Sequence, residues 1–180
     1  QRIFRVCRYY LVQCKNLIVP QGSIITFSGV DGAGKTTVIN EVIESLKNKY
    51  RKEVVYLRHR PGLLPILSAV KHGSRAEAEK ISSQNLPRQG KNKNKISSIL
   101  RFSYYYADYI LGQIMVRVKY LSRDKIVIYD RYYFDFINDS KRSNICLKRS
   151  FIKRMYTFIS KPDFNFYLYN DPKVILQRKK

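Results

Sequence analysis

The chain has 180 residues, 44% of them hydrophobic, which is enough for one α/β domain with a buried core and too little for two domains of that size. Its formal net charge of +22 favours polyanionic partners such as nucleic acid, an anionic membrane or charged nucleotides, although lysines that only solvate the surface give the same balance. No run of about 18 uncharged apolar residues occurs, so we expect no transmembrane segment. The cysteines Cys7, Cys14 and Cys146 lack metal-binding spacing, and we expect reduced thiols in a cytoplasmic protein.

The arginines and apolar residues of segment 2–15 predict a basic amphipathic helix, with its three arginines on one side. Four alternatives remain open: the helix lies on a membrane surface, contacts another part of a longer protein, packs against the domain, or frays. Pro20-Gln21-Gly22 ends the segment. We therefore expect a basic N-terminal extension over residues 1–22 and the main domain over residues 23–180.

The stretch from Ile24 to Thr37 contains the clearest motif. An apolar, β-type run breaks into Gly29-Val30-Asp31-Gly32-Ala33-Gly34-Lys35-Thr36, which fits the phosphate-loop pattern G-x-x-x-x-G-K-[ST] between a strand and a helix. Glycines allow positive φ, so successive amide N–H groups point into one concavity at the positive end of the following helix. The residues predicted to hold phosphates are Gly29, Gly32, Ala33, Gly34, Lys35, Thr36 and Thr37.

Two side chains of this loop add specific chemistry. The Lys35 amine would reach the β- and γ-phosphates, and the Thr36 hydroxyl would ligate the Mg²⁺ that bridges them. The dinucleotide pattern G-x-G-x-x-G does not fit, because Thr37 stands where the third glycine is required. The sequence therefore favours a nucleoside triphosphate over a dinucleotide.

Strand and helix patterns alternate along the rest of the chain. Apolar residues within 38–46 predict a core-facing helix, and residues 54–57 predict a buried strand that leads into the segment 58–62. Residues 61–95 have no clear period and include a basic stretch that predicts a mobile loop. Residues 97–121 again show a helical period. The tyrosines clustered there either pack in the core or stack on a flat ring of a ligand.

The last third of the chain adds a candidate metal ligand. Residues 126–129 predict another buried strand, and Asp130 at its end would organise Mg²⁺ opposite the phosphate loop. A helix over residues 151–159, capped by Ser150, and a strand over residues 164–169 follow. The alternation indicates an α/β fold with a doubly wound parallel sheet flanked by helices.

These motifs together resemble the thymidylate kinase-like family of P-loop nucleoside monophosphate kinases over residues 23–180. The residues that carry the resemblance are Phe27 to Thr37, Arg58 to Gly62, Asp130-Arg131-Tyr132, Lys161-Pro162-Asp163 and Tyr167-Leu168. The resemblance implies a P-loop NTPase fold with five parallel strands and a mobile lid, and transfer of the γ-phosphoryl group of ATP, with Mg²⁺, to a nucleoside monophosphate. The lid and the last strand are missing, so we expect an incomplete C-terminus and a chain that is a piece of a longer protein.

Matching positions bring the family's residue roles to this chain. By this resemblance, Asp31 lies near the acceptor, Arg131 bridges acceptor and donor phosphates, and Asp130 organises Mg²⁺ or water. The implied catalytic residues are Lys35, Asp31, Arg131 and Asp130, and the implied metal ligands are Thr36 and Asp130. The implied acceptor-binding residues are Arg60, Tyr105, Tyr109 and Arg142.

The chain also departs from the family pattern. Arg60 stands where an acid is usual, and Tyr109 stands where the family carries an arginine that reads the base, four residues after the aromatic Tyr105. Without that guanidinium, the sequence argues against thymidylate as the acceptor. The segment 130–135 is more similar to a divergent branch found with polysaccharide biosynthesis genes, and Arg178 is the remaining candidate for a lid arginine.

Three functions follow from these observations. The first is an ATP- and Mg²⁺-dependent phosphotransferase, a nucleotide kinase-like enzyme with a small nucleotide-like acceptor. The second is a catalytically weak ATP-binding module that docks to a membrane or a protein through the basic N-terminus. The third is a nucleic-acid-binding protein or 5′-end kinase, which the net charge favours. A homodimer, and peripheral contact of the basic surface with membrane or nucleic acid, stay open.

Overall fold

A computed structural model describes residues 2–30, 32–64, 94–139, 145–171 and 175. The chain divides into two compact units. Unit 1 consists of Gln1–His59, Gln113–Tyr132 and Ser160–Lys180, and unit 2 consists of Arg60–Gly112 and Tyr133–Ile159. All of the described strands belong to unit 1.

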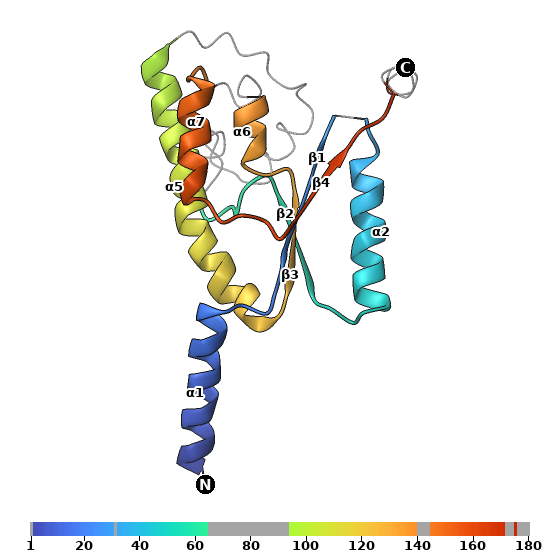
Figure 1. Cartoon of the computed structure of the whole chain (residues 1–180), viewed down its shortest axis with the longest axis vertical. Coiled ribbons are helices and arrows are strands. Elements are labelled where there is room, and N and C mark those ends of the chain that lie inside the picture. The colour runs from blue at the N-terminus through green and yellow to red at the C-terminus, as the bar shows by residue number, and fades with distance from the viewer. Residues whose placement is uncertain (1, 31, 65–93, 140–144, 172–174, 176–180) are drawn as a thin grey trace, which may run out of the picture. The chain divides into compact units, whose positions relative to one another are not determined.

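Unit 1 is built on a sheet whose four described strands are parallel and lie in the order β2-β3-β1-β4 (Figure 1). The strands are β1 (Ile24–Gly29), β2 (Val54–Arg58), β3 (Ile126–Asp130) and β4 (Phe164–Leu168). Each lies at an apolar run that the sequence predicts as a strand. Because β1 lies between β3 and β4, the strand that leads into the glycine-rich loop is an inner strand of the sheet.

One face of the sheet packs against α2 (Lys35–Asn48). Phe27 of β1, Ile128 of β3 and Ile39 of α2 form the buried centre of this layer. The partly buried side chains around them are Ile25, Val38, Val42, Ile43, Leu46, Val54, Ile126 and Leu168. The helical members are the apolar stripe predicted for residues 38–46, and its burial fixes α2 on the strands that support the loop.

The outer strands are more exposed than the sequence suggests. β3 is hydrogen-bonded on both sides and almost wholly buried, whereas β2 and β4 form the edges of the described sheet. In β2 the side chain of Tyr56 is 45% exposed. The prediction of a buried strand over residues 54–57 is therefore wrong in its burial, because an apolar run indicates a strand but not its place in the sheet.

Unit 2 is organised by aromatic packing. Its helices are the first part of α5 (Lys95–Lys119), α6 (Phe134–Asn138) and α7 (Arg149–Met155), with a 3₁₀ turn, η2 (Tyr156–Phe158). Tyr133 and Phe136 are buried with ring centroids 5.6 Å apart, and the ring of Tyr109 lies 5.5 Å from that of Tyr133. The Tyr133 hydroxyl donates to the carbonyl oxygen of Ile152 over 2.9 Å, so its polar end is satisfied inside the core.

Two local predictions differ from the structure. The helix expected over residues 151–159 begins earlier, as α7 at Arg149, and its N-cap is Lys148 without a side-chain hydrogen bond. Ser150 is therefore not the cap but a residue of the first turn. Helix α6 was not predicted, because a segment of five residues is too short to show a helical period.

The basic N-terminal segment forms the predicted helix, α1 (Arg2–Ile18). A further 3₁₀ turn, η1 (Leu121–Arg123), contacts α1 within unit 1. The three cysteines are free, as expected. Among the helices that the structure describes, none combines the length and the apolar character needed to cross a membrane.

Candidate functional site

The glycine-rich loop leaves the sheet at the carboxyl end of β1. Gly29 ends the strand with φ of 147°, and Gly32 and Gly34 have φ of 92° and 85°. A Cβ at Gly29 would also lie 2.2 Å from the carbonyl oxygen of Leu168 in β4. The predicted use of glycine for positive φ is thus confirmed at all three positions, and at Gly29 the neighbouring strand excludes a side chain as well.

The first turn of α2 supplies the amide groups of the loop. Gly34 is the N-cap, in the left-handed conformation, and has no side chain with which to cap the first-turn amides. Thr36 and Thr37 lie exposed in this turn. Amide N–H groups at the positive end of a helix, next to a glycine-rich turn, form a site suited to an anion such as phosphate.

The Lys35 side chain turns back into the loop. Its Nζ donates hydrogen bonds to the carbonyl oxygens of Gly29 and Val30, each over 2.9 Å, and the residue is 7% exposed. The main-chain N–H of Ala33 donates to the Val30 carbonyl oxygen over 3.2 Å and closes the turn. The ammonium group is therefore held inside the loop, where it favours negative charge.

Asp130 lies at the end of β3, beside β1. It is paired with Phe27 in β1 and with Arg58 in β2, so three strand ends meet at one edge of the sheet. The N–H of Arg131 donates to the Phe27 carbonyl oxygen over 2.8 Å, and the N–H of His59 donates to that of Asp130 over 2.9 Å. Arg131 and His59 have φ of 73° and 66°, a conformation rare for these residues and found often at functional sites.

The two carboxylate oxygens of the buried Asp130 differ in their surroundings. The Tyr56 hydroxyl donates to Oδ2 over 3.1 Å. Oδ1 is buried, and no hydrogen-bond partner for it exists in the part of the chain that the structure describes. Desolvation, together with the Asp130 charge, raises the pKa of Tyr56 to about 12, so this hydroxyl stays a proton donor at neutral pH. Although Tyr56 is half exposed as a residue, its hydroxyl lies against the buried carboxylate.

This arrangement fits a Mg²⁺ ion better than a metal held by protein alone. Mg²⁺ usually binds through one or two carboxylates, waters and substrate phosphates, and the Oδ1 atom of Asp130 is a buried oxygen of the required kind. Thr36, the other predicted ligand, lies in the first turn of α2. Over the described ranges, no group of three or more histidine, cysteine or acidic side chains could hold a metal.

A second charged cluster lies in unit 2. The buried Asp108 of α5 accepts two hydrogen bonds at Oδ2, from Arg60 Nη1 over 3.1 Å and from the Gly62 N–H over 3.2 Å. At Oδ1 it accepts a third, from the Leu64 N–H over 2.6 Å. The Arg60 guanidinium also lies 4.8 Å from the centre of the Tyr105 ring. One carboxylate thus fixes both the segment 60–64 and the cation it carries.

The face of α5 that holds this segment is defined by helical spacing. Tyr105, Asp108 and Gly112 follow one another at i, i+3 and i+7, and a Cβ at Gly112 would lie 2.3 Å from Cβ of Pro61. Tyr109, one helical turn after Tyr105, is 1% exposed and packs in the aromatic core against Phe136. The structure therefore brings together two of the predicted acceptor residues, Arg60 and Tyr105, and places Tyr109 behind them. Asp31 and Arg142 lie outside the described residues.

Sequence reasoning missed two residues of these clusters. Asp108 is an acid in an otherwise apolar helical stripe, four residues before a glycine, and that combination was the available signal for a buried polar contact. Tyr56 gave no signal, because its contact with Asp130 depends on the pairing of β2 with β3.

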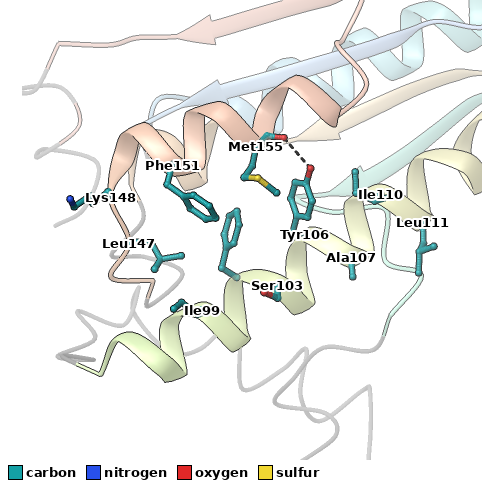
Figure 2. Close-up of a pocket in the computed structure, with 11 residues that line it drawn as sticks. Ile99, Ser103, Tyr106, Ala107, Ile110, Leu111, Leu147, Lys148, Phe151 and Met155 are labelled. Carbon is teal, nitrogen blue, oxygen red and sulfur yellow. Dashed lines mark hydrogen bonds between the residues drawn. The ribbon is translucent and has the colours of Figure 1, made fainter.

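An apolar pocket of about 750 Å³ lies on the other face of α5 within unit 2 (Figure 2). The Tyr106 hydroxyl donates to the carbonyl oxygen of Met155 over 3.1 Å and links the two helices beside it. The residues that line the pocket include Ile99, Phe102, Ile110, Phe151 and Met155. Neither Arg60 nor Asp108 lines it, so this pocket is separate from the charged cluster.

The family model and the relatives that match this chain have the same description, thymidylate kinase. A family model described as Thymidylate kinase matches residues 27–180. The thymidylate kinase of Lactobacillus delbrueckii subsp. bulgaricus is 52% identical over 42 residues, which are 23% of this chain and 19% of that protein. The thymidylate kinase of Chlorobium phaeobacteroides is 32% identical over 166 residues, which are 87% of this chain and 64% of that protein. The chain thus spans less than two thirds of either relative.

A solved structure agrees with the fold. The thymidylate kinase from Ehrlichia chaffeensis is 22% identical, with a TM-score of 0.55 over 88% of this chain and 82% of that one. At this identity the likeness bears on the fold alone. Together with the parallel strand order, it confirms the predicted α/β P-loop fold with a sheet flanked by helices.

Proposed function

This chain belongs to the thymidylate kinase family, and we propose that it takes part in transfer of the γ-phosphoryl group of ATP to a nucleoside monophosphate-like acceptor. The observation that supports this most is the loop of unit 1, in which the Lys35 amine is enclosed by glycine-rich backbone beside the strand that ends in Asp130. Phosphoryl transfer needs positioning and charge stabilisation more than covalent chemistry from the protein. A cationic loop held between a strand and a helix provides both.

The loop would bind the donor phosphates. The amides of the first turn of α2 would receive phosphate oxygens, and Lys35 would exchange its bonds to two carbonyl oxygens for bonds to phosphate. The exchange is favourable because a hydrogen bond between two charged groups is stronger than one between an ammonium and a neutral carbonyl. The present contacts with Gly29 and Val30 keep the amine in the loop beforehand, so little side-chain ordering is left for the binding step.

Asp130 and Thr36 are the proposed Mg²⁺ ligands. When bound there, Mg²⁺ would offset charge on the β- and γ-phosphates. Tyr56 would hold Oδ2 of Asp130 and so keep Oδ1 directed to the ion or one of its waters. Arg131 would offer its guanidinium to the transferred phosphoryl group, and Asp31 would act near the acceptor.

Unit 2 would contribute the acceptor contacts. Arg60 carries five N–H donors, of which Nη1 contacts Asp108, so the same guanidinium can also bind an anionic or carbonyl group of the acceptor. Tyr105 would position this guanidinium at the acceptor, since its ring lies under Arg60 and stacks on Phe136. Tyr109 would support this wall from the core, and Arg142 would add a second cation. With Tyr109 in the place of a base-reading arginine, we propose a nucleotide-like acceptor other than thymidylate.

The first prediction tests the loop. Labelled γ-phosphate of MgATP is offered to nucleosides, nucleoside monophosphates, sugar phosphates and oligonucleotide 5′ ends. Lys35→Ala should lower kcat/KM for the preferred acceptor by about 10²- to 10³-fold, since it removes one donor aimed at charge that develops in the transition state. Lys47→Ala, at an exposed lysine in the last turn of the same helix, should leave transfer unchanged.

The results of this assay distinguish a small-molecule kinase from a nucleotide-binding module and from a nucleic-acid kinase. Undiminished transfer by a folded Lys35→Ala variant would contradict the assignment of the loop. ATP binding without transfer to any acceptor would favour a nucleotide-binding module. Transfer confined to oligonucleotide ends would favour a nucleic-acid kinase, and its steep loss with salt would confirm that the net charge of +22 attracts the strand.

A further inference from the structure

The apolar side of α1 has nothing packed over it in the described structure, since none of the helix residues is buried. At 3.6 residues per turn, most of its apolar side chains fall on one unbroken arc of about 160°, whereas Tyr9 and Val12 lie outside it. The largest exposed members of this arc are Ile3, Phe4, Val6, Tyr10, Leu11 and Ile18. Cys7 and Cys14 lie in the same arc and are exposed as well. An arc of this width normally faces a core or another apolar phase.

The rest of the helix circumference carries the basic residues of α1, together with Tyr9, Val12, Gln13 and Asn16. Arg2, Arg5, Arg8 and Lys15 lie outside the arc, and the helix contains neither aspartate nor glutamate. Arg8 and Lys15 border the apolar arc directly. Long basic side chains in that position can keep their methylene stems on an apolar surface while their charged ends reach phosphate groups above it.

The C-terminal end of α1 is tied to unit 1. Arg117 donates from Nε to the Leu17 carbonyl oxygen over 2.7 Å and from Nη2 to that of Ile18 over 2.6 Å. A cation on the last carbonyls also complements the negative end of the helix. Arg123 is exposed in the 3₁₀ turn that contacts α1.

We propose that α1 is an in-plane membrane anchor that attaches unit 1 to an anionic lipid surface. The apolar arc would enter the acyl boundary, and the basic residues would meet the headgroup phosphates. An anionic bilayer matches both sides of the helix, whereas a nucleic acid would match the basic side and leave the apolar arc in water. This proposal does not depend on the proposed phosphoryl transfer.

Two adjacent tyrosines provide a matched test. Tyr10 lies in the apolar arc and Tyr9 outside it, with ring centroids 5.6 Å apart, and their exposed fractions are 62% and 60%. The full chain should sediment with vesicles of phosphatidylcholine containing about 30% phosphatidylglycerol, and weakly with phosphatidylcholine alone, at about 0.1 M salt. Tyr10→Asp should lower the partition coefficient at least about tenfold, because it removes an apolar anchor and adds a charge to the buried side. Tyr9→Asp should lower it no more than about threefold, through charge alone.

A label at a single position reports the depth of each side. With Cys7 and Cys146 replaced by serine, a nitroxide on Cys14 should become accessible to oxygen and protected from a water-soluble relaxation agent when vesicles are added. With all three cysteines replaced by serine, a nitroxide at Tyr9→Cys, outside the arc and exposed, should stay accessible to water. ATP binding should be equal in all of these variants, since none of them changes the loop.

Several results would overturn the proposal. These are equal loss of vesicle binding in the Tyr9 and Tyr10 variants, no sedimentation with anionic vesicles, and a Cys14 label that stays in water. Protection of Cys14 without vesicles, together with a dimer that Tyr10→Asp dissociates, would assign the arc to a second copy of the chain instead. Tight binding to oligonucleotides in place of vesicles would assign the basic side to nucleic acid.

Discussion

Asp108 illustrates how one buried carboxylate replaces several contacts that a short segment cannot make for itself. The segment 60–64 follows β2 without regular structure, so its N–H groups need partners from outside it. Asp108 accepts from two of them and from the Arg60 guanidinium, and it is wholly buried. A charge buried in this way is tolerated because each of its bonds comes from a donor that would otherwise be unsatisfied.

Asp108→Ala should lower the free energy of unfolding by about 3 kcal/mol, because it leaves a partly buried cation and two N–H groups without their acceptor. If unit 2 binds the acceptor, KM for the acceptor should rise at least about tenfold while KM for ATP changes little. Urea denaturation and steady-state kinetics measure these two effects.

Asp108→Asn is the matched control, because its carbonyl oxygen can still accept from the Leu64 N–H. We expect it to lose about half as much stability as the alanine variant. Wild-type stability and wild-type KM in Asp108→Ala would contradict this account of the segment.

The phosphate loop depends on the strand beside it as much as on its own glycines. Gly29 is paired with Leu168 of β4, and the carbonyl oxygen of that residue occupies the space of a side chain at Gly29. The start of the loop is thus set by sheet pairing, and its end is set by the helix that begins at Lys35. Two elements far apart in the sequence therefore determine one loop conformation.

Gly29→Ala should destabilise the protein by about 3 kcal/mol or more. The added Cβ would collide with the β4 backbone, and alanine would have to adopt a φ of 147°, which L-residues rarely do. ATP binding should be lost along with the loop conformation. The measurements are urea denaturation and an ATP titration.

Gly62→Ala provides the comparison. Gly62 also has positive φ, 73°, but the nearest atom to its Cβ position lies 4.0 Å away, so this substitution introduces strain without collision. We expect a loss of about 1 kcal/mol there. Equal losses at the two positions would mean that the β4 carbonyl moves away, and the argument from collision would fail.

Buried tyrosines link the stability of the protein to alkaline pH. Burial raises the pKa of Tyr133 above its usual value near 10, and desolvation beside Asp130 raises that of Tyr56 to about 12. In the unfolded chain these groups ionise from about pH 10, while in the folded chain they keep their protons. The unfolded state therefore loses these protons at lower pH than the folded state does. As a result, the contribution of the two tyrosines to the free energy of unfolding falls as pH rises above about 10.

We expect the free energy of unfolding to decline from about pH 10 upwards, and Tyr133→Phe to make that decline shallower. At pH 8 the variant should be about 1 kcal/mol less stable, because the bond to the Ile152 carbonyl oxygen is lost. The two proteins have the same lysines and arginines, so their difference isolates the tyrosine. A difference in stability that does not change between pH 8 and pH 11 would contradict the pKa argument.

The sequence by itself determined the local parts of this protein. The β1–loop–α2 unit, the strands, α5 and the basic N-terminal helix were predicted from apolar period, glycine spacing and proline, because each depends on interactions between residues close in the chain. The α/β fold with a parallel sheet followed from the alternation of these elements, and the P-loop fold was implied by the resemblance of their motifs to a known family. The amphipathic character of residues 2–15 was likewise predicted, whereas the exposure of the apolar side chains of α1 is known from the structure alone.

Only the tertiary structure decided which residues meet. Sheet order makes β2 an edge strand and brings the Tyr56 hydroxyl to Asp130, and neither fact is contained in a local pattern. The sequence also does not show that Asp108 binds the segment 60–64, since that contact depends on how the segment lies against α5. Nor does it show that Tyr109 is buried in the aromatic core. Contacts between residues far apart in the chain depend on packing and strand pairing. Local sequence patterns therefore do not reveal them.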